Sequence, residues 1–456
     1  MFRRILVANR GEIALRVLRA CRELGVESVI VYSEADRDAP WLEHADQRVC
    51  IGPARADRSY LDAGAILQAA EQTDARAIHP GYGFLSENAV FAARCEQQGI
   101  TFIGPGPDAI RRMGDKAEAK RTIAGAGLPT IPGSKDVLPD TAAAAELADE
   151  IGFPVLLKAT AGGGGKGMRR CDSADDLVRA FSEASIEAEK AFGNPGLYME
   201  RFLEGGRHVE FQILCDTAGQ GIHLGERECS VQRNHQKLIE ESPSPGVSAE
   251  LRKTMGERVA QASAAIGYRN AGTVEFLMDA EGRLYFMEMN TRLQVEHPVT
   301  EMVTGVDLVE QQLRVAAGQP LALSQQDITL EGHAIELRIN AEDPEQNFRP
   351  DPGEISHFAP PPEEIAGAKV RWDSAIRSGY RIPPHYDSMI GKLIVHGPDR
   401  PRTIDAAIAA LDAMELRGIH STVALQRRIL DHPDFRSGQY DVNFLGRSGL
   451  LPASNG

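Results

Sequence analysis

The N-terminal part of the chain alternates short, uninterrupted apolar runs with helical patterns, and this alternation limits the folds open to it. Such runs lie at 5–8, 28–32, 77–79 and 100–103. After the first run a helical pattern begins at Gly11 and places Ile13, Val17 and Leu18 on one face. Strands that are apolar on both faces and alternate with helices are typical of a parallel sheet with helices on both sides. We therefore expect an open parallel α/β sheet over residues 1–107.

The rest of the 456-residue chain follows other patterns, and its length allows about three domains. Two short strands around a glycine tract predict a small α+β unit, and alternating runs up to 284–296 predict a large, mainly antiparallel sheet. We thus expect a multidomain α/β and α+β protein. After the N-terminal sheet come a bridging helix and linker, the small unit, the large antiparallel part and a frayed tail, expected at 108–133, 134–204, 205–450 and 451–456.

Acidic side chains outnumber basic ones, with 65 Asp and Glu against 50 Lys and Arg, so the formal net charge is -15. A surface of this charge repels phosphate backbones and anionic lipids, which argues against nucleic acid or a membrane as the main partner. Six scattered cysteines without a C-x-x-C pair favour a reducing compartment, and the run at 5–8 is too short for a signal peptide. We expect a cytoplasmic protein.

The glycine tract at 162–167 is a candidate phosphate-binding loop. It does not lead into the helix that a dinucleotide fingerprint requires, and its Lys166 lacks the following Ser or Thr of a P-loop. What is left is a loop whose backbone N–H groups can approach a phosphate closely, with Lys158 and Lys166 as counter-charges. The alternative is a solvent-exposed loop without a ligand.

Residues 273–289 have the pattern of a β-hairpin that brings two carboxylates together. A four-residue loop at 280–283 pairs Glu275 with Glu288. Directly opposed residues have Cβ atoms about 5 Å apart, so two like charges there destabilise the sheet unless water screens them or a cation joins them. A hairpin that faces a cleft therefore needs a cation.

Every even position from Glu288 to Glu296 is polar, which predicts a continuing strand with one polar face. Oxygen ligands from Glu275, Glu288 and Asn290 suit Mg²⁺ bound to nucleotide phosphates. Arg292, two residues further along, suits an anionic substrate. The alternative is an ordinary half-solvated strand.

Five segments, taken together, carry a specific resemblance to a known family. They lie at 4–13, 79–88 (HPGYGFLSEN), 158–167, 227–237 and 288–298 (EMNTRLQVEHP). In this order and spacing they closely resemble biotin carboxylase, the ATP-grasp component of biotin-dependent carboxylases. The resemblance runs from about residue 2 to residue 450. It implies a pre-ATP-grasp N-terminal domain, a glycine-rich ATP-grasp lid and a C-terminal ATP-grasp part with the large antiparallel sheet.

The resemblance also implies an activity and its site. The reaction would use ATP with Mg²⁺ or Mn²⁺ to activate bicarbonate as carboxyphosphate, and then carboxylate N1′ of biotin. Matching motifs imply ATP contacts at Lys116, Lys158, Gly164, Gly165, Glu200, Arg201, Phe202, Leu203, His208 and His235, and metal ligands at Glu275, Glu288 and Asn290. They imply a bicarbonate pocket of Lys237, Arg292, Val295 and Arg338 with Glu296 as the base, and biotin contacts at Arg338 and Tyr82.

Partners are implied by the same resemblance. No lysine here is flanked by methionines as a biotin acceptor is, so biotin is expected on a separate biotin carboxyl carrier protein. Carboxyltransferase subunits would then complete an acetyl-CoA carboxylase of the bacterial type, which makes malonyl-CoA for fatty acid synthesis. The family is typically a homodimer, and Arg16, Arg19 and Asp387 match positions near its interface. Arg201 stands where the family commonly has lysine.

Two other functions stay open at this point. Another ATP-grasp ligase, such as a carboxylate–amine ligase of purine synthesis, would share the lid and the metal carboxylates but would not need the pocket at 235–237 and 292–296. A nucleotide-binding subunit without turnover is disfavoured because each expected catalytic position carries a suitable residue.

Overall fold

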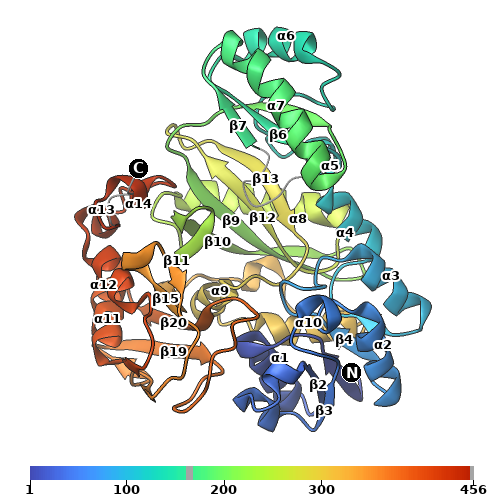
Figure 1. Cartoon of the computed structure of the whole chain (residues 1–456), viewed down its shortest axis with the longest axis vertical. Coiled ribbons are helices and arrows are strands. Elements are labelled where there is room, and N and C mark those ends of the chain that lie inside the picture. The colour runs from blue at the N-terminus through green and yellow to red at the C-terminus, as the bar shows by residue number, and fades with distance from the viewer. Residues whose placement is uncertain (161–167, 452–456) are drawn as a thin grey trace.

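The N-terminal residues form the parallel sheet that their apolar runs predict. The computed structural model describes residues 1–160 and 168–451, and in it five parallel strands have the order β3-β2-β1-β4-β5 (Figure 1). Their bounds are β1 Arg4–Val7, β2 Glu27–Tyr32, β3 Gln47–Cys50, β4 Ala77–His79 and β5 Thr101–Phe102. The helices α1 Gly11–Glu23, α2 Ala63–Gln72 and α3 Ala89–Gln97 connect them.

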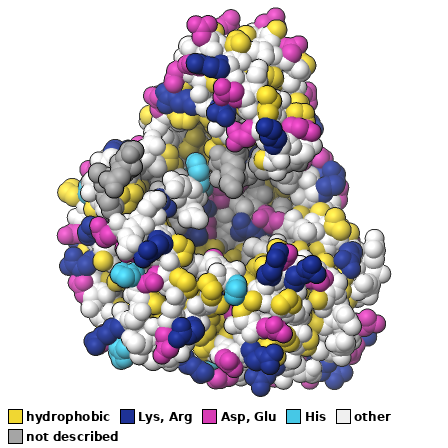
Figure 2. All heavy atoms as spheres, in the orientation of Figure 1, with side chains coloured by type: hydrophobic (Ala, Val, Ile, Leu, Met, Phe, Trp, Pro, Cys, Tyr) yellow, Lys and Arg dark blue, Asp and Glu magenta, His cyan; other side chains and the backbone are white. Residues whose placement is uncertain are grey.

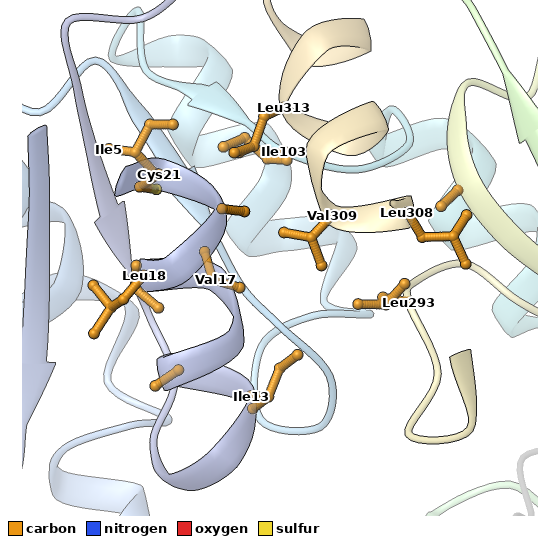
Figure 3. Close-up of a cluster of buried hydrophobic side chains, with 14 of the residues drawn as sticks. Ile5, Ile13, Val17, Leu18, Cys21, Ile103, Leu293, Leu308, Val309 and Leu313 are labelled. Carbon is orange, nitrogen blue, oxygen red and sulfur yellow. The ribbon is translucent and has the colours of Figure 1, made fainter. Parts of the chain in front are cut away.

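One apolar core joins this sheet to a distant part of the chain. Ile13 and Val17 of α1 point toward Val309 on α10 (Leu308–Ala316), whereas Leu18 points to the other side of α1 (Figure 3). Leu293 lies close to Leu308 and Val309 in the same core. Leu293 is fully buried although it follows Arg292, a predicted site residue. The core therefore fixes the backbone of the predicted site from the apolar side.

The predicted bridging helix is two helices, α4 (Pro107–Gly114) and α5 (Lys116–Gly125). Asp115 separates them in an extended conformation, and its side chain accepts a hydrogen bond from the backbone N–H of Glu118 at 2.8 Å. An aspartate in this position is a favourable N-cap, so it begins a second helix. As a result Lys116 is the first residue of a helix.

The small α+β unit contains a three-stranded antiparallel sheet of order β7-β6-β8, from β6 (Val155–Ala159), β7 (Met168–Cys171) and β8 (Leu197–Arg201). Helices α6 (Thr141–Ile151) and α7 (Ala174–Phe192) pack on it. This unit is the green part at the top of Figure 1, above the body of the molecule. The predicted glycine contacts at Gly164 and Gly165, and Lys166, lie outside the described residues.

The large sheet is antiparallel throughout and has the order β13-β12-β9-β10-β11-β14-β20-β19-β18. Its strands are β9 Arg207–Cys215, β10 Gly221–Arg233, β11 Gln236–Ser242, β12 Asn270–Met278, β13 Leu284–Asn290, β14 His333–Asn340, β18 Glu364–Ile365, β19 Ala368–Ser374 and β20 Met389–Gly397. Two short pairs, β15 (Glu342–Asp343) with β16 (Arg349–Pro350) and β17 (His357–Ala359) with β21 (Glu415–Arg417), lie beside it.

Helices pack against alternate residues of these strands, and polar residues occupy many of the positions between them. Odd-numbered side chains of β9 pack with α8 (Ala249–Ala265), and those of β14 pack with α11 (Arg400–Ala413). Helix α9 (His297–Thr304) packs against β10, β11, β14 and β20. The chain ends with α12 (Val423–Asp431), α13 (Pro433–Ser437) and α14 (Phe444–Arg447). Within the described ranges, each helix is too short or too polar to cross a membrane.

The hairpin places Glu275 directly opposite Glu288, as predicted, but by another route. Met278 pairs with Leu284, so five residues rather than four form the loop. A register shift between Glu275 and Phe276 then restores the expected pairing. Such a bulge inserts one extra residue into one strand.

The prediction that this strand continues to Glu296 is wrong, because β13 ends at Asn290. Glu87 accepts a hydrogen bond from the backbone N–H of Thr291 at 3.0 Å, and Leu293 turns into the apolar core. Both contacts come from segments far away in the sequence, and they take the backbone out of the sheet. The alternating side chains therefore do not share a strand face.

Candidate active site

Although β13 ends at Asn290, polar side chains of the segment 288–296 still contact polar residues of the large sheet. Gln294 donates a hydrogen bond to Glu275 at 2.8 Å, and Asn290 donates one to the same carboxylate at 2.7 Å. Arg292 donates to the side-chain oxygen of Asn290 at 3.0 Å. Figure 2 shows the surface hollowed between the small unit at the top and the body below it.

Lys237 is the centre of a buried cluster of carboxylates. It is the second residue of β11, directly after the tight β10–β11 turn. Its Nζ lies 2.6 Å from Glu210, 2.5 Å from Glu296 and 3.2 Å from Glu275. These three carboxylates are nearly inaccessible to solvent. Since buried carboxylates are costly without a cation, the lysine and the cluster require each other.

A second cation binds the other side of Glu296. Arg338 on β14 lies 2.9 Å from Glu296 and 2.5 Å from Glu240, which is fully buried. Glu296 thus bridges Lys237 and Arg338, and two of the predicted pocket residues hold the predicted base.

Arg227 binds several residues of the Lys237 cluster and its surroundings. Its guanidinium is wholly buried and donates to Glu210 at 2.6 Å, Gln212 at 2.7 Å and Gln294 at 2.8 Å, and also to the hydroxyls of Thr273 and Thr300. A planar guanidinium with this many partners fixes their relative positions. Three strands and the segment before α9 are joined through this one side chain.

The cluster keeps its carboxylates in different protonation states. Burial alone would raise the pKa of Glu296, but Lys237 and Arg338 lower that pKa well below 4.5. Burial likewise opposes ionisation of Glu275, while Lys237 and His208 hold its pKa well below 4.5. In contrast, burial raises the pKa of Glu240 to about 7 despite Arg338. Glu296 is therefore an ionised carboxylate, as a base must be.

The opposed pair of the hairpin could hold a divalent cation. Burial and the charge of Glu275 raise the pKa of Glu288, so the two carboxylates repel each other. Lys116 reaches Glu288 only at 4.0 Å, and His208 lies 2.9 Å from Glu275. Oxygen donors from Glu275, Glu288 and Asn290 suit Mg²⁺, whose charge would relieve this repulsion.

Arg292 is held by the N-terminal part of the chain. Its Nε donates to Glu87 at 2.8 Å, and Glu87 also accepts from the backbone of Thr291. Glu87 was not among the predicted site residues, although it lies in the quoted 79–88 motif. The sequence pattern included Glu87, but it gave no indication that this carboxylate pairs with Arg292.

The predicted nucleotide contacts of the small unit form a separate group. Glu200 is buried between Lys158 and Lys120, the latter at 3.0 Å. Arg201 is exposed, and Phe202 and Leu203 are half-buried. His235 lies outside this unit and is exposed in the β10–β11 turn of the large sheet, where Asn234 and His235 have positive φ angles of 48° and 66°. Among the described residues, no hydrogen bond or ion pair joins 200–203 to Lys237 or its three carboxylates.

Predicted residues at the other end of the site have unexpected partners. The Tyr82 hydroxyl donates to the buried carboxylate of Glu12, and the carbonyl of Val295 accepts from Lys392 at 2.8 Å. Of the three residues that match the family's dimer interface, Arg16 is 6% exposed and forms ion pairs with Glu301 and Asp307 of its own chain. Arg19 and Asp387 are exposed.

Comparisons with known proteins agree over the whole chain. Residues 1–110 match the family model of the biotin carboxylase N-terminal domain, and residues 336–447 match that of the biotin carboxylase C-terminal domain. Residues 115–324 match the ATP binding domain of the carbamoyl-phosphate synthase L chain. A biotin carboxylase of Nostoc sp. is 53% identical over 97% of this chain and 98% of its own length. The chain belongs to the biotin carboxylase family.

Two solved structures of that family have the same fold. The biotin carboxylase of Campylobacter jejuni, in a βγ-ATP complex, has a TM-score of 0.93 and 48% identity over 98% of this chain and 99% of its own. The biotin carboxylase domain dimer of the Hydrogenobacter thermophilus 2-oxoglutarate carboxylase, in complex with MgADP, ADP and bicarbonate, has a TM-score of 0.93 and 47% identity over the full length of both chains.

Several residues of the site were not predicted from the sequence. Glu210, Glu240, Glu336 and Lys392 are buried, Lys120 is half-buried and Glu87 is exposed. Glu210 shares the polar period of two with His208 and Gln212, which was a usable signal. Lys392 is the single charged residue of β20, and its partners Val295 and Glu12 lie outside the strands and far away in the sequence.

The lowered pKa values of Glu275 and Glu296 predict acid sensitivity. A carboxylate whose folded pKa lies below 4.5 stabilises the protein above that pH, and this contribution is lost as the pH falls through the folded pKa. Each pKa unit is worth about 1.4 kcal/mol. Urea unfolding should therefore show stability falling below about pH 4.5, and less steeply in Glu296→Gln. Glu71→Gln, on the exposed side of α2, should keep the wild-type slope. Equal slopes in all three proteins would contradict this.

Proposed function

We propose that this protein catalyses the ATP- and bicarbonate-dependent carboxylation of biotin at N1′. The observation that carries the proposal is the buried carboxylate of Glu296, held between Lys237 and Arg338, with Arg292 four residues before it in the same segment. A planar guanidinium binds bicarbonate through two hydrogen bonds, and an adjacent carboxylate can accept its proton. A carboxylate–amine ligase has no use for this combination.

In the proposed reaction Glu296 takes the bicarbonate proton while Arg292 and Lys237 hold the anion. The deprotonated oxygen attacks the γ-phosphoryl group of ATP, ADP leaves and carboxyphosphate forms. Biotin N1′ then takes the carboxyl group as the bond between carboxyl and phosphate breaks. The leaving phosphate accepts the N1′ proton, and Arg338 lies against the enolate oxygen that biotin develops. Phosphoryl transfer depends mainly on positioning and charge, which a buried cluster of fixed cations supplies.

The nucleotide would lie between the small unit and the hairpin. We assign ATP contacts to Lys116, Lys158, 200–203, His208 and His235, together with Gly164 and Gly165, which lie outside the described residues. Glu275, Glu288 and Asn290 would hold Mg²⁺ or Mn²⁺, which neutralises phosphate charge. The domains would then be an N-terminal domain at 1–107, a bridge at 108–133, a lid at 134–204 and a C-terminal part at 205–450.

The partners are part of the proposal. Biotin would be presented on a separate biotin carboxyl carrier protein, next to Tyr82 and Arg338. Carboxyltransferase subunits would then transfer the carboxyl group to acetyl-CoA, giving malonyl-CoA for fatty acid synthesis in the cytoplasm. The exposed Arg19 and Asp387 fit a homodimer contact, while Arg16 is engaged within its own chain.

The activity can be tested with free biotin. ADP release should require bicarbonate and should rise when biotin is added, because ATP is cleaved only to activate bicarbonate. The measurement is a coupled ADP assay in buffer freed of carbon dioxide, with and without added bicarbonate. Equal ATP hydrolysis without bicarbonate would exclude the proposed function.

Arg292→Ala and Glu296→Ala should lose biotin carboxylation, the latter by about 10²–10⁴-fold in kcat, because a general base of this kind contributes about that much. ATP affinity, measured by calorimetry, should stay near the wild-type value. Arg269→Ala is a matched control, since Arg269 is an exposed arginine paired with Glu96 away from the site. Parallel loss of ATP binding in the Arg292 and Glu296 variants would place them in the nucleotide site instead.

Glu288→Ala should raise the Mg²⁺ concentration required for half-maximal activity and lower the turnover, since it removes one of three oxygen ligands. The titration is run at saturating ATP and bicarbonate. Glu281→Ala, in the exposed loop of the same hairpin, serves as the control. Wild-type turnover at ordinary Mg²⁺ in Glu288→Ala would remove the metal site from the hairpin.

A further inference from the structure

A fully buried lysine outside the predicted site lies where three distant parts of the chain meet. Lys392 is on β20, opposite Arg338 of β14 on one side and Asp373 of β19 on the other. Its side chain is 0% exposed. The ammonium donates a hydrogen bond to the carbonyl of Val295 at 2.8 Å and lies 3.2 Å from Glu12.

The partners of Lys392 belong to the two predicted substrate pockets. The carbonyl of Val295 is part of the peptide unit whose N–H belongs to Glu296, the predicted base. Glu12, in the first turn of α1, accepts a hydrogen bond from the hydroxyl of Tyr82, the predicted biotin neighbour. A continuous chain of contacts therefore runs from Val295 through Lys392 and Glu12 to Tyr82.

These linked contacts hold parts of the site that lie outside helices and strands. Val295 lies after the end of β13 and before α9, and Tyr82 lies in the turn-rich segment between β4 and α3. A lysine side chain is usually flexible, but burial among Glu12, Glu336 and Asp373 fixes this one. A buried ammonium keeps its place only with such compensation. Lys392 is thus a buried point to which both of these loop segments are attached.

We propose that Lys392 is a positioning residue that sets both substrate pockets at once. It holds the Val295–Glu296 peptide on the bicarbonate side and, through Glu12, the hydroxyl of Tyr82 on the biotin side. The inference rests on the proposed function and goes beyond it, because Lys392 would touch no substrate itself. It predicts that bicarbonate and biotin binding depend on the same buried cation, while ATP binding does not.

The test separates the KM values of the three substrates. Lys392→Met combined with Glu12→Gln removes the ammonium together with the charge of the carboxylate that lies 3.2 Å from it. We expect the KM values for bicarbonate and free biotin to rise about 10- to 100-fold, since small misplacements of a site cost that much. The KM for ATP should stay at the wild-type value. Glu12→Leu alone keeps the Lys392–Val295 bond but removes the acceptor of the Tyr82 hydroxyl, so it should raise the KM for biotin and leave that for bicarbonate unchanged.

A matched control removes a buried ion pair elsewhere. Arg252→Met with Glu226→Gln breaks a pair at 2.7 Å between α8 and β10, and it should change none of the three KM values. The inference is overturned if the folded Lys392 variant keeps wild-type KM values for bicarbonate and biotin, or if its KM for ATP rises equally.

Two further outcomes are decisive. If the Lys392 variant fails to fold, as judged by circular dichroism, the Glu12→Leu variant decides, and a biotin KM equal to that of wild type overturns the inference. Wild-type protein without bicarbonate-dependent turnover would instead overturn the proposed function, and the inference with it.

Discussion

The ammonium of Lys237 among three buried carboxylates is the interaction on which the rest of the site depends. Glu210 comes from β9, Glu275 from β12 and Glu296 from the segment before α9, so one lysine compensates charges from three separate pieces of backbone. Removing one partner of a buried ion pair typically costs about 3–5 kcal/mol, because the other charges are left buried and unpaired. Because such a cluster adds little net stability to the fold, we attribute its arrangement to a role in the reaction.

Around this cluster the site is assembled from all parts of the chain. Glu87 of the N-terminal part fixes Arg292, and Lys392 of the C-terminal part fixes Val295. Leu293, which lies in sequence between Arg292 and Val295, is fixed by the apolar core of α1 and α10. The segment 291–296 is thus held by contacts from the N-terminal part, the apolar core and the C-terminal part of the molecule. A segment held in this way can present charged groups at fixed distances without belonging to a strand.

Local patterns predicted much of the fold. The continuous apolar runs predicted the N-terminal parallel sheet, and the turn at 279–283 predicted the opposition of Glu275 and Glu288. Contacts between distant residues decided what the patterns missed. Polar alternation predicted a strand to Glu296, but Glu87 and Leu293 end it early. Lys392 resembles any lysine in a β-strand until β14 and β19 are placed beside it.

We propose that bicarbonate binds at the Lys237 cluster, and a crystal structure of the protein with MgADP and bicarbonate would show whether it does. We expect a planar anion that accepts hydrogen bonds from Arg292 and Lys237 and lies against the carboxylate of Glu296. An anion bound elsewhere, with Lys237 still bonded only to its three carboxylates, would contradict it.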